Sequence, residues 1–253
     1  MIYIVFLIFT GLVLVFALYQ LQYFMIFTPT YFRDGEFDEN FEILSITTDD
    51  GVELEGVVFT PKNPKNTILF FAGRTQDSVG LIKRLATIYS DSRIITFNYR
   101  SYGRSAGVIN EKNMFFDGVY IANIIQKNYG DFYLLGFSIG SVIASNIATQ
   151  IKTKALVLVG SFDSVTHLLQ AKYPFVPSWF IKYKFNNSVL VQNVDSPTHL
   201  FVSTDDEITY IQNARDLKSC VKNLKTYKEF DNLKHKELLW DNDVISEIKQ
   251  VIN

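Results

Sequence analysis

Between residues 66 and 160, apolar runs of strand length alternate regularly with segments of helical periodicity. The runs are "NTILFFAG", "RIITFNY", "DFYLLGF" and "KALVLVG", and the segments between them are "SVGLIKRLATIY", "FFDGVYIANIIQK" and "IGSVIASNIATQI". Such alternation favours a mainly parallel sheet, and strands that are apolar throughout imply that helices cover both of its faces. The sequence therefore predicts an α/β fold.

The same kind of order continues on either side of this region. "FEILSITT" and "VELEGVVF" flank the turn signal "DDG", which predicts a β-hairpin. Further along lie "SPTHLFVST", the helical "TYIQNARDLK", the strand "LKTYKEF" and a single final helix over "KELLWDNDVISEIKQVI". Residues 161–187 break the alternation, and their stretch "YPFVPSWFIKYKF" is rich in proline and aromatic residues. We interpret 161–187 as a short cap inserted above the sheet.

The chain begins with 32 residues that contain no charged side chain, and "MIYIVFLIFTGLVLVFALY" is almost wholly apolar. As a helix this stretch spans about 28 Å, close to the hydrocarbon thickness of about 30 Å of a bilayer. The basic start and small-residue cleavage site of a signal peptide are not visible. We therefore predict a single-pass transmembrane anchor over 1–27, a neck over 28–40 and an α/β domain over 41–253.

The residues that follow the apolar stretch are expected to leave the membrane through its interface, where amphipathic aromatic side chains are favoured. These residues are Tyr19, Gln20, Gln22 and Tyr23. The alternative for the whole segment is a buried core helix. Flanking charges do not decide on which side of the membrane the domain lies, because Arg33 is the one basic residue near the exit.

Composition excludes several other classes of function. The net charge of −2 argues against a nucleic-acid surface, which would need a basic stripe. Cys220 is the single cysteine, so a disulfide-stapled scaffold is excluded. The three histidines lack the spacing of metal ligands, and we predict neither a metal site nor a cofactor.

One motif carries a candidate nucleophile. In "YLLGFSIGSVIASNIA", Gly136, Ser138 and Gly140 have the G-x-S-x-G spacing at the point where a strand gives way to a helix. In a nucleophile elbow the serine occupies a sharp turn, and small neighbours such as Ser141 prevent clashes. The backbone N–H of Ile139, at the start of the helix, is placed to bind a developing oxyanion. An ordinary tight turn is the alternative.

A serine nucleophile needs a base and an acid that orients it. His235 follows the last predicted strand and is the favoured base, because His199 lies within a strand and His167 lies in the insertion. The acid is expected at the end of "FVSTDDE", which offers Asp205, Asp206 and Glu207. The runner-up acid is Asp163, at the end of the preceding strand.

These motifs carry a resemblance. Residues 36–251 resemble the α/β-hydrolase family, and within it the Bem46-like branch that includes the ABHD13- and ABHD17-type proteins. The matching blocks are "TTDDGVELEG", "LFFAGRTQD", "NYRSYGRSAG", "GFSIGS", "YPFVP" and "STDDEITY", together with "FMIFTP" beside the membrane segment. The resemblance implies a serine hydrolase with the chain order Ser, Asp, His, which Ser138, Asp206 and His235 match. It also implies a second oxyanion N–H, from Arg74.

The chain departs from the family pattern at four positions. Ala72 stands where histidine is usual before Gly73, and Arg74 where asparagine is frequent. Ser203 and Lys234 replace glycines before the acid and the base. None of these changes removes a reacting group, since an oxyanion donor at Arg74 needs only its backbone.

Taken together, the sequence predicts a membrane-anchored hydrolase of carboxylic esters or thioesters. Phe175, Trp179 and Phe180, in the insertion, are expected to line a greasy cap suited to acyl lipids or acyl-proteins, although they would equally serve to pack the insertion onto the sheet. Tyr99 and Arg100 are expected to shape a strand end. A catalytically silent scaffold and a serine peptidase on the same fold remain alternatives.

Overall fold

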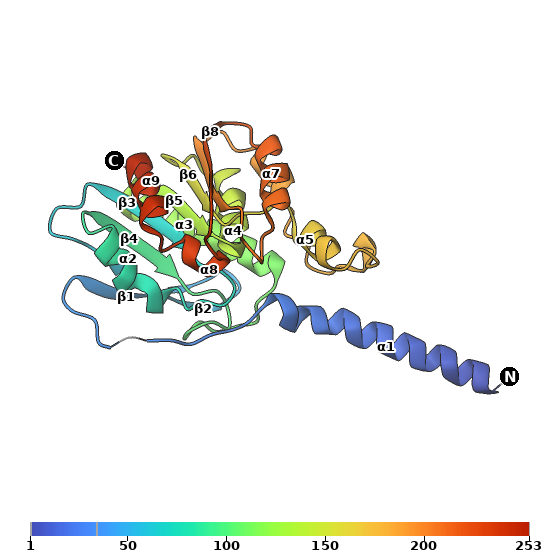
Figure 1. Cartoon of the computed structure of the whole chain (residues 1–253). Coiled ribbons are helices and arrows are strands. Elements are labelled where there is room, and N and C mark those ends of the chain that lie inside the picture. The colour runs from blue at the N-terminus through green and yellow to red at the C-terminus, as the bar shows by residue number, and fades with distance from the viewer. Residues whose placement is uncertain (1, 34, 253) are drawn as a thin grey trace.

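The computed structural model describes residues 2–33 and 35–252 and contains an eight-stranded sheet with the order β1-β2-β4-β3-β5-β6-β7-β8. Figure 1 shows this twisted sheet with helices on both sides and with α1 projecting away from it. The predicted α/β class is confirmed. The strands are β1 Phe41–Thr47, β2 Glu53–Phe59, β3 Asn66–Phe71, β4 Ser92–Phe97, β5 Tyr133–Phe137, β6 Leu156–Val159, β7 Thr198–Ser203 and β8 Leu224–Phe230.

The sheet is parallel from β4 to β8 and antiparallel at its first edge. β1 pairs with β2 as the predicted hairpin, and β2 pairs antiparallel with β4. β3 and β5 lie side by side in parallel register, with Phe71 opposite Gly136. The loops that follow these two strands therefore meet at the carboxyl edge of the sheet, where sites in open α/β sheets are built.

Helices cover both faces because the strands bury apolar side chains on both. One face packs against α3, α4, α6 and α7, and the other against α2, α8 and α9. The helical elements are α1 Ile2–Ile26, η1 Val79–Leu81, α2 Ile82–Ile88, α3 Glu111–Tyr129, α4 Ile139–Ala148, α5 Val165–Lys172, η2 Ser178–Phe180, α6 Asn187–Val191, α7 Ile211–Cys220, α8 His235–Leu238 and α9 Asn242–Ile252.

The single helix predicted over residues 236–252 is wrong. The chain forms two helices, α8 and α9, and the break between them has a local cause. The Asp241 carboxylate accepts hydrogen bonds from the backbone N–H groups of Asp243 and Val244. A carboxylate that satisfies these N–H groups starts a new helix and ends the preceding one. The break leaves His235 at the beginning of a short helix.

The first helix extends beyond the predicted apolar stretch, and one side of its last turns is buried against the domain. α1 is long and apolar enough to cross a membrane. Gln22 is buried, because its amide nitrogen donates to the Phe180 carbonyl (2.9 Å) and its amide oxygen accepts from the Lys182 N–H (2.8 Å). The predicted position of Gln22 in the membrane interface stays a prediction, and within the chain its amide is covered by the insertion. The insertion folds back onto α1 and satisfies this polar group.

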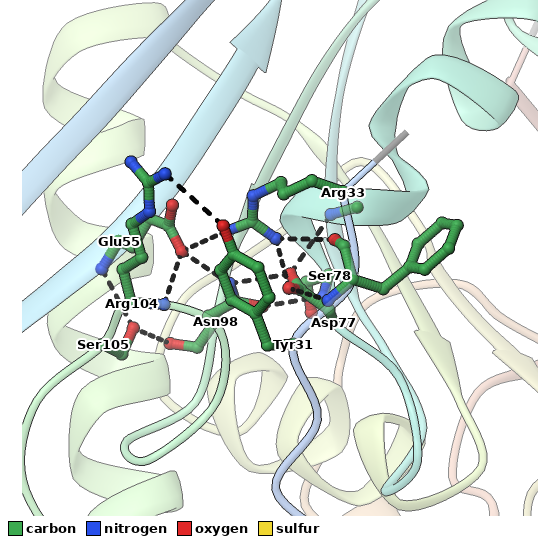
Figure 2. Close-up of polar contacts among 10 residues, drawn as sticks. Tyr31, Arg33, Glu55, Asp77, Ser78, Asn98, Arg104 and Ser105 are labelled. Atoms are coloured by element: carbon green, nitrogen blue, oxygen red, sulfur yellow. Dashed lines mark hydrogen bonds and ion pairs between the residues drawn. The ribbon is translucent and has the colours of Figure 1, made fainter. Parts of the chain in front are cut away.

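Figure 2 shows how the segment after α1 is fastened to the domain through Arg33. The Arg33 guanidinium contacts both the Glu55 carboxylate, on β2, and the Asp77 carboxylate, in the loop after β3. The Asn98 amide donates to the same two carboxylates, at 3.0 and 2.9 Å. The Phe32 N–H also donates to Asp77 (2.9 Å). This Arg33 cluster ties the neck to three separate elements of the domain.

Candidate active site

Ser138 sits on the turn between β5 and α4 with a φ of 55° and a ψ of −124°. Few residues other than glycine adopt such a backbone, and it projects the side chain from the edge of the sheet. A Cβ on Gly136 would lie 2.6 Å from the Gly140 carbonyl oxygen, and one on Gly140 would lie 2.2 Å from the Phe71 carbonyl oxygen. Both glycines are therefore required for α4 to start against β5 and β3.

His235 stands within hydrogen-bond distance of the serine hydroxyl. Its Nε2 lies 2.9 Å from Ser138 Oγ, and its Nδ1 lies 2.7 Å from Asp206 Oδ2. All three residues are at least 93% buried, with exposed fractions of 7% for Ser138, 6% for His235 and 5% for Asp206. The structure thus brings together three side chains that are far apart in the sequence, in the order serine, imidazole, carboxylate.

The Asp206 carboxylate is held as an anion by its neighbours. Its Oδ1 accepts the N–H groups of Ile208 (2.8 Å) and Thr209 (2.7 Å), and its Oδ2 accepts the Thr209 hydroxyl (2.6 Å). Burial raises the pKa of Asp206, but the hydrogen bonds from His235 and Thr209 outweigh burial and leave the pKa below its ordinary value. A charged carboxylate here orients the imidazole with its proton on Nδ1.

The imidazole is fixed from its faces as well as its edges. The ring of Phe137 stacks on His235, with centroids 5.0 Å apart and planes inclined by 28°. On another side, a Cβ on Gly160 would lie 3.2 Å from the His235 Cε1 atom, and Gly160 has a φ of +55°. The Glu207 carboxylate accepts the backbone N–H of His235 (3.2 Å). These contacts leave His235 one position, facing Ser138.

The loop after β3 is placed beside the serine by two tyrosines. The Tyr99 hydroxyl donates to the Ala72 carbonyl (2.8 Å), and the Tyr102 hydroxyl donates to the Arg74 carbonyl (2.5 Å). Arg74 and Ile139 line the same cavity as Ser138. Ile139 is the first residue of α4, where backbone N–H groups have no partner within the helix. The arrangement suits two backbone donors aimed at one oxyanion.

Comparison with known proteins agrees with this architecture. No protein-family model matches the chain. Lysophosphatidylserine lipase ABHD12 of Macaca fascicularis is 25% identical over 158 residues, which are 54% of this chain and 40% of that protein. Alpha/beta hydrolase domain-containing protein 17B of Xenopus tropicalis is 26% identical over 159 residues, 58% of this chain and 52% of the relative. The solved esterase Pf2001 of Pyrococcus furiosus, at 16% identity, has a TM-score of 0.66 over 89% of this chain and 96% of its own. This chain has the α/β-hydrolase fold.

This α/β-hydrolase chain spans about half or less of the two curated relatives' own lengths. The presence of a 17B protein among the relatives agrees with the branch expected from the sequence, but only loosely. Within the fold, Ser138 follows β5, Asp206 follows β7 and His235 follows β8. All three therefore lie at the carboxyl edge of the sheet.

The other candidate acids and bases are engaged elsewhere. His199 lies in β7 and faces the Thr226 hydroxyl (3.0 Å). The runner-up acid, Asp163, pairs with His167 and also accepts the amide of Asn213 (2.9 Å). Asp205 is exposed, and it accepts the N–H of Asn232 (2.8 Å). These partners separate the candidates left open by the sequence, because Asp206 alone of the acids lies against His235 Nδ1.

Of two departures from the family pattern, Ser203 has a local structural role through its side chain, whereas Lys234 contributes its backbone N–H. The Ser203 hydroxyl donates to the Leu233 carbonyl (2.6 Å) and accepts the Asp205 N–H (3.2 Å), so it ties the acid loop to the segment before His235. The Lys234 N–H donates to the Glu237 carboxylate (2.7 Å) at the start of α8.

Among residues 2–33 and 35–252, no group of three or more His, Cys, Asp or Glu side chains is arranged to hold a metal ion.

Arg100 is buried and fully engaged in structure, as expected. It forms paired hydrogen bonds with Asp117 (2.8 and 2.7 Å) and with Asp50 (2.7 and 2.9 Å). The arginine thereby fastens the β1–β2 turn and α3 to the loop that carries Tyr99 and Tyr102. Arg100 therefore supports the loop beside the site and does not line the cavity at Ser138.

The Asp50–Arg100 pair gives a testable pH dependence. Hydrogen bonds from Arg100, and then Thr48, lower the pKa of Asp50 to about 2, against about 3.9 in an unfolded chain. Because the folded pKa is the lower one, this pair stabilises the fold above about pH 4 and loses its effect as the pH falls toward about 2. We expect the urea midpoint of the wild type to drop more steeply over this range than that of Asp50→Asn. Equal slopes of the urea midpoint against pH in the two proteins would contradict a contribution of this pair to stability. Asp49→Asn, at the exposed neighbouring position, is the control.

Ser138 opens into a cavity of about 200 Å³ whose wall is mostly apolar. Apolar side chains from α5 and from the end of α1 form one side, and the segment after Asp206 forms another. These apolar lining residues include Met25, Ile26, Leu168, Leu169 and Tyr173. Lys172, Arg74 and Glu207 are charged residues in the same wall.

The three aromatic residues expected to bind substrate do not line this cavity. Phe175 and Trp179 are 83% and 77% exposed, and Phe180 packs edge-on against Tyr19 of α1, with ring centroids 5.8 Å apart. The physical reason is the bond between Gln22 and the backbone of the insertion, which turns this segment toward α1. These three side chains therefore form no part of the cavity wall at Ser138, and their predicted binding of substrate stays a prediction.

Several contributors to the site were missed by sequence reasoning. Thr209 holds the acid, Gly160 makes room for the base, and Met25 of α1 contributes to the cavity wall. Thr209 left a signal, because a threonine three residues after an aspartate commonly caps the turn that the aspartate begins. Met25 left none, since its role depends on how α1 docks.

Proposed function

We propose that this chain hydrolyses carboxylic esters or thioesters of acyl lipids or acylated proteins, with Ser138 as nucleophile, His235 as base and Asp206 as the orienting acid. The observation that carries the proposal is the hydrogen-bonded series at 2.9 Å and 2.7 Å beneath a mostly apolar cavity. We further propose that α1 anchors the enzyme in a membrane, since it has the length and composition to span one.

In the first half of the reaction, Ser138 Oγ attacks the acyl carbonyl while His235 Nε2 takes its proton. The positive charge that develops on the imidazole is stabilised by Asp206, which also holds the tautomer with Nε2 free to accept. The N–H groups of Ile139 and Arg74 receive the negative charge on the carbonyl oxygen. Loss of one such donor typically raises the barrier by about 3 kcal/mol.

In the second half, the leaving alcohol or thiol takes the proton from His235 and departs, which leaves an acyl-serine. A water molecule then gives a proton to His235 Nε2 as it attacks the acyl carbon. Collapse of this second tetrahedral species releases the acid and returns the proton to Ser138 Oγ. No further cofactor is needed to balance either half.

The names of the relatives favour esters as the bond type. One is a lysophosphatidylserine lipase and the superposed structure is an esterase. The apolar wall around Ser138 and its contact with the end of α1 favour a substrate with an acyl chain at a membrane.

A fluorophosphonate probe tests the proposal directly, because it phosphonylates only an activated serine. We expect the full chain in vesicles to be labelled, and Ser138→Ala to lose all labelling. Ser145→Ala is the matched control. Ser145 lies two turns further along α4, and its hydroxyl donates to the Ser141 carbonyl of the same helix (2.9 Å).

The outcomes separate the alternatives. Labelling of the wild type and of Ser145→Ala, but not of Ser138→Ala, supports the proposal. Absence of labelling in every protein would point instead to a silent scaffold. Labelling combined with turnover of peptide amides but not of esters would indicate a peptidase on the same fold.

A further inference from the structure

Three hollows follow one another from Ser138 along α1. The cavity at Ser138 shares Met25, Leu169 and Tyr173 with a second hollow of about 240 Å³. The second hollow shares Phe180 with a third, of about 270 Å³, which lies against the middle of α1. The third is lined by Leu12, Val15, Phe16, Tyr19, Trp179 and Phe180. The shared side chains place the three hollows next to one another, in a path that follows α1.

The second hollow is lined by apolar side chains, apart from Gln22. The amide of Gln22 is already occupied by the backbone of residues 180 and 182, so it offers little to a polar ligand. Leu18 and Met25 form the α1 side of this hollow, and Val176 and Ile181 lie on the opposite side. Such a lining suits a hydrocarbon chain and gives no partner to a charged or peptide group.

We propose that this path, between α1 and the segment from α5 to η2, is the acyl-chain channel through which a membrane lipid reaches Ser138 directly from the bilayer. The proposal rests on the proposed ester hydrolysis and adds the route of the substrate. It also assigns α1 a second role, because Leu18 and Met25 become substrate-binding residues of the anchor helix itself.

The far end of the channel lies at the depth of the membrane. If α1 spans a bilayer, its residues from Leu12 to Phe16 face lipid, and Trp179 lies against them. The amine of Lys182 donates to the Gln20 side chain (3.3 Å) and lies over the Tyr19 ring, which marks the headgroup level. A channel that opens beside Trp179 therefore opens below the headgroups.

The exposed aromatic residues now have an explanation. Phe175 and Trp179 are largely exposed within the chain, and they line the second and third hollows, respectively. Large aromatic rings are favoured in the interface of a bilayer. In a bilayer, lipid would cover the Phe175 and Trp179 rings, which the chain itself leaves exposed.

The channel needs α1 to keep its position relative to Ser138, and several contacts fix it. The Arg74 guanidinium contacts the Met25 carbonyl at the end of α1, and the Tyr102 hydroxyl accepts the Thr28 N–H (2.9 Å). The Arg33 cluster holds the next residues of the neck (Figure 2). The loop expected to supply an oxyanion donor is thereby joined to the wall of the channel.

Substitution of Leu18 by tryptophan tests the channel. Leu18 is 47% exposed within the chain and lines the second hollow, so a larger ring narrows the path without disturbing the core. In phosphatidylcholine vesicles, we expect Leu18→Trp to lower the ratio of kcat/KM for p-nitrophenyl palmitate to that for p-nitrophenyl butyrate by about tenfold. The butyrate ester measures the proposed function, and the ratio measures the channel.

Leu21→Trp is the matched control. Leu21 has a similar exposed fraction of 50% on the same helix and is not among the residues lining the second hollow. The ratio should keep its wild-type value in this variant. If Leu18→Trp also keeps the wild-type ratio while butyrate is hydrolysed, the channel is overturned and the proposed function stands. If the wild type hydrolyses neither ester, the proposed function fails and the channel fails with it.

A second measurement does not depend on turnover. In Trp240→Phe, Trp179 is the remaining tryptophan, because the chain contains two. We expect vesicles of brominated phosphatidylcholine to quench its fluorescence strongly compared with unbrominated vesicles. Fluorescence that is insensitive to bromination would place Trp179 outside the bilayer and overturn the proposed opening of the channel.

Discussion

Replacing Asp206 with asparagine is expected to lower kcat/KM for ester substrates about 10⁴-fold. Asparagine can present its NH₂ group to His235 Nδ1, which then loses its proton and leaves the proton on Nε2. A histidine in that tautomer cannot accept a proton from Ser138. The Ile208 and Thr209 N–H groups can still bond the remaining carbonyl oxygen, so the fold of the loop should survive.

The neighbouring Asp205→Asn is the matched control for this prediction. Asp205 is exposed and bonds to Asn232 and Thr204, away from the imidazole. We expect its turnover of p-nitrophenyl butyrate to stay within about twofold of the wild type, as exposed substitutions of this kind are mild. A comparable loss in both variants, or a small loss in Asp206→Asn with unchanged circular dichroism, would remove Asp206 from the proposed role.

The fold and the serine were accessible from sequence because both depend on short-range signals. Strand-length apolar runs and helical periodicity are local, and the two glycines around Ser138 express a local steric need that the structure makes explicit. His235 was accessible for a related reason. Of the three histidines, it alone follows a strand end rather than lying in a strand or in the insertion.

The remaining features depend on contacts between distant segments. Asp163 and Asp206 both follow parallel strands, and only the partners Asn213, His167 and Thr209 distinguish them. Loops direct these partners, and loop conformation leaves a weak trace in sequence. The docking of the aromatic segment after α5 was not foreseen for a comparable reason, because it depends on a single buried polar residue, Gln22, that bonds the segment to α1.

Replacing Arg33 with methionine is expected to lower the free energy of unfolding by about 3–5 kcal/mol. The Arg33 side chain is 17% exposed, and its two carboxylate partners, Glu55 and Asp77, are 7% and 0% exposed. Methionine keeps most of the apolar stem but leaves two buried carboxylates without their cation. The Asn98 amide contacts both carboxylates but carries no charge to replace the guanidinium (Figure 2).

Arg104→Met separates this effect from a general loss of positive charge. The Arg104 guanidinium belongs to the same view in Figure 2, but it is exposed and bonds only weakly to the Tyr31 hydroxyl, at 3.4 Å. Its loss should cost about 0–1 kcal/mol, as for other exposed charges. Urea unfolding of both variants in one detergent gives the comparison. Equal and small losses would mean that the Arg33 cluster does not hold the neck, whereas a large loss for Arg33→Met alone would show that the attachment of α1 contributes to the stability of the whole domain.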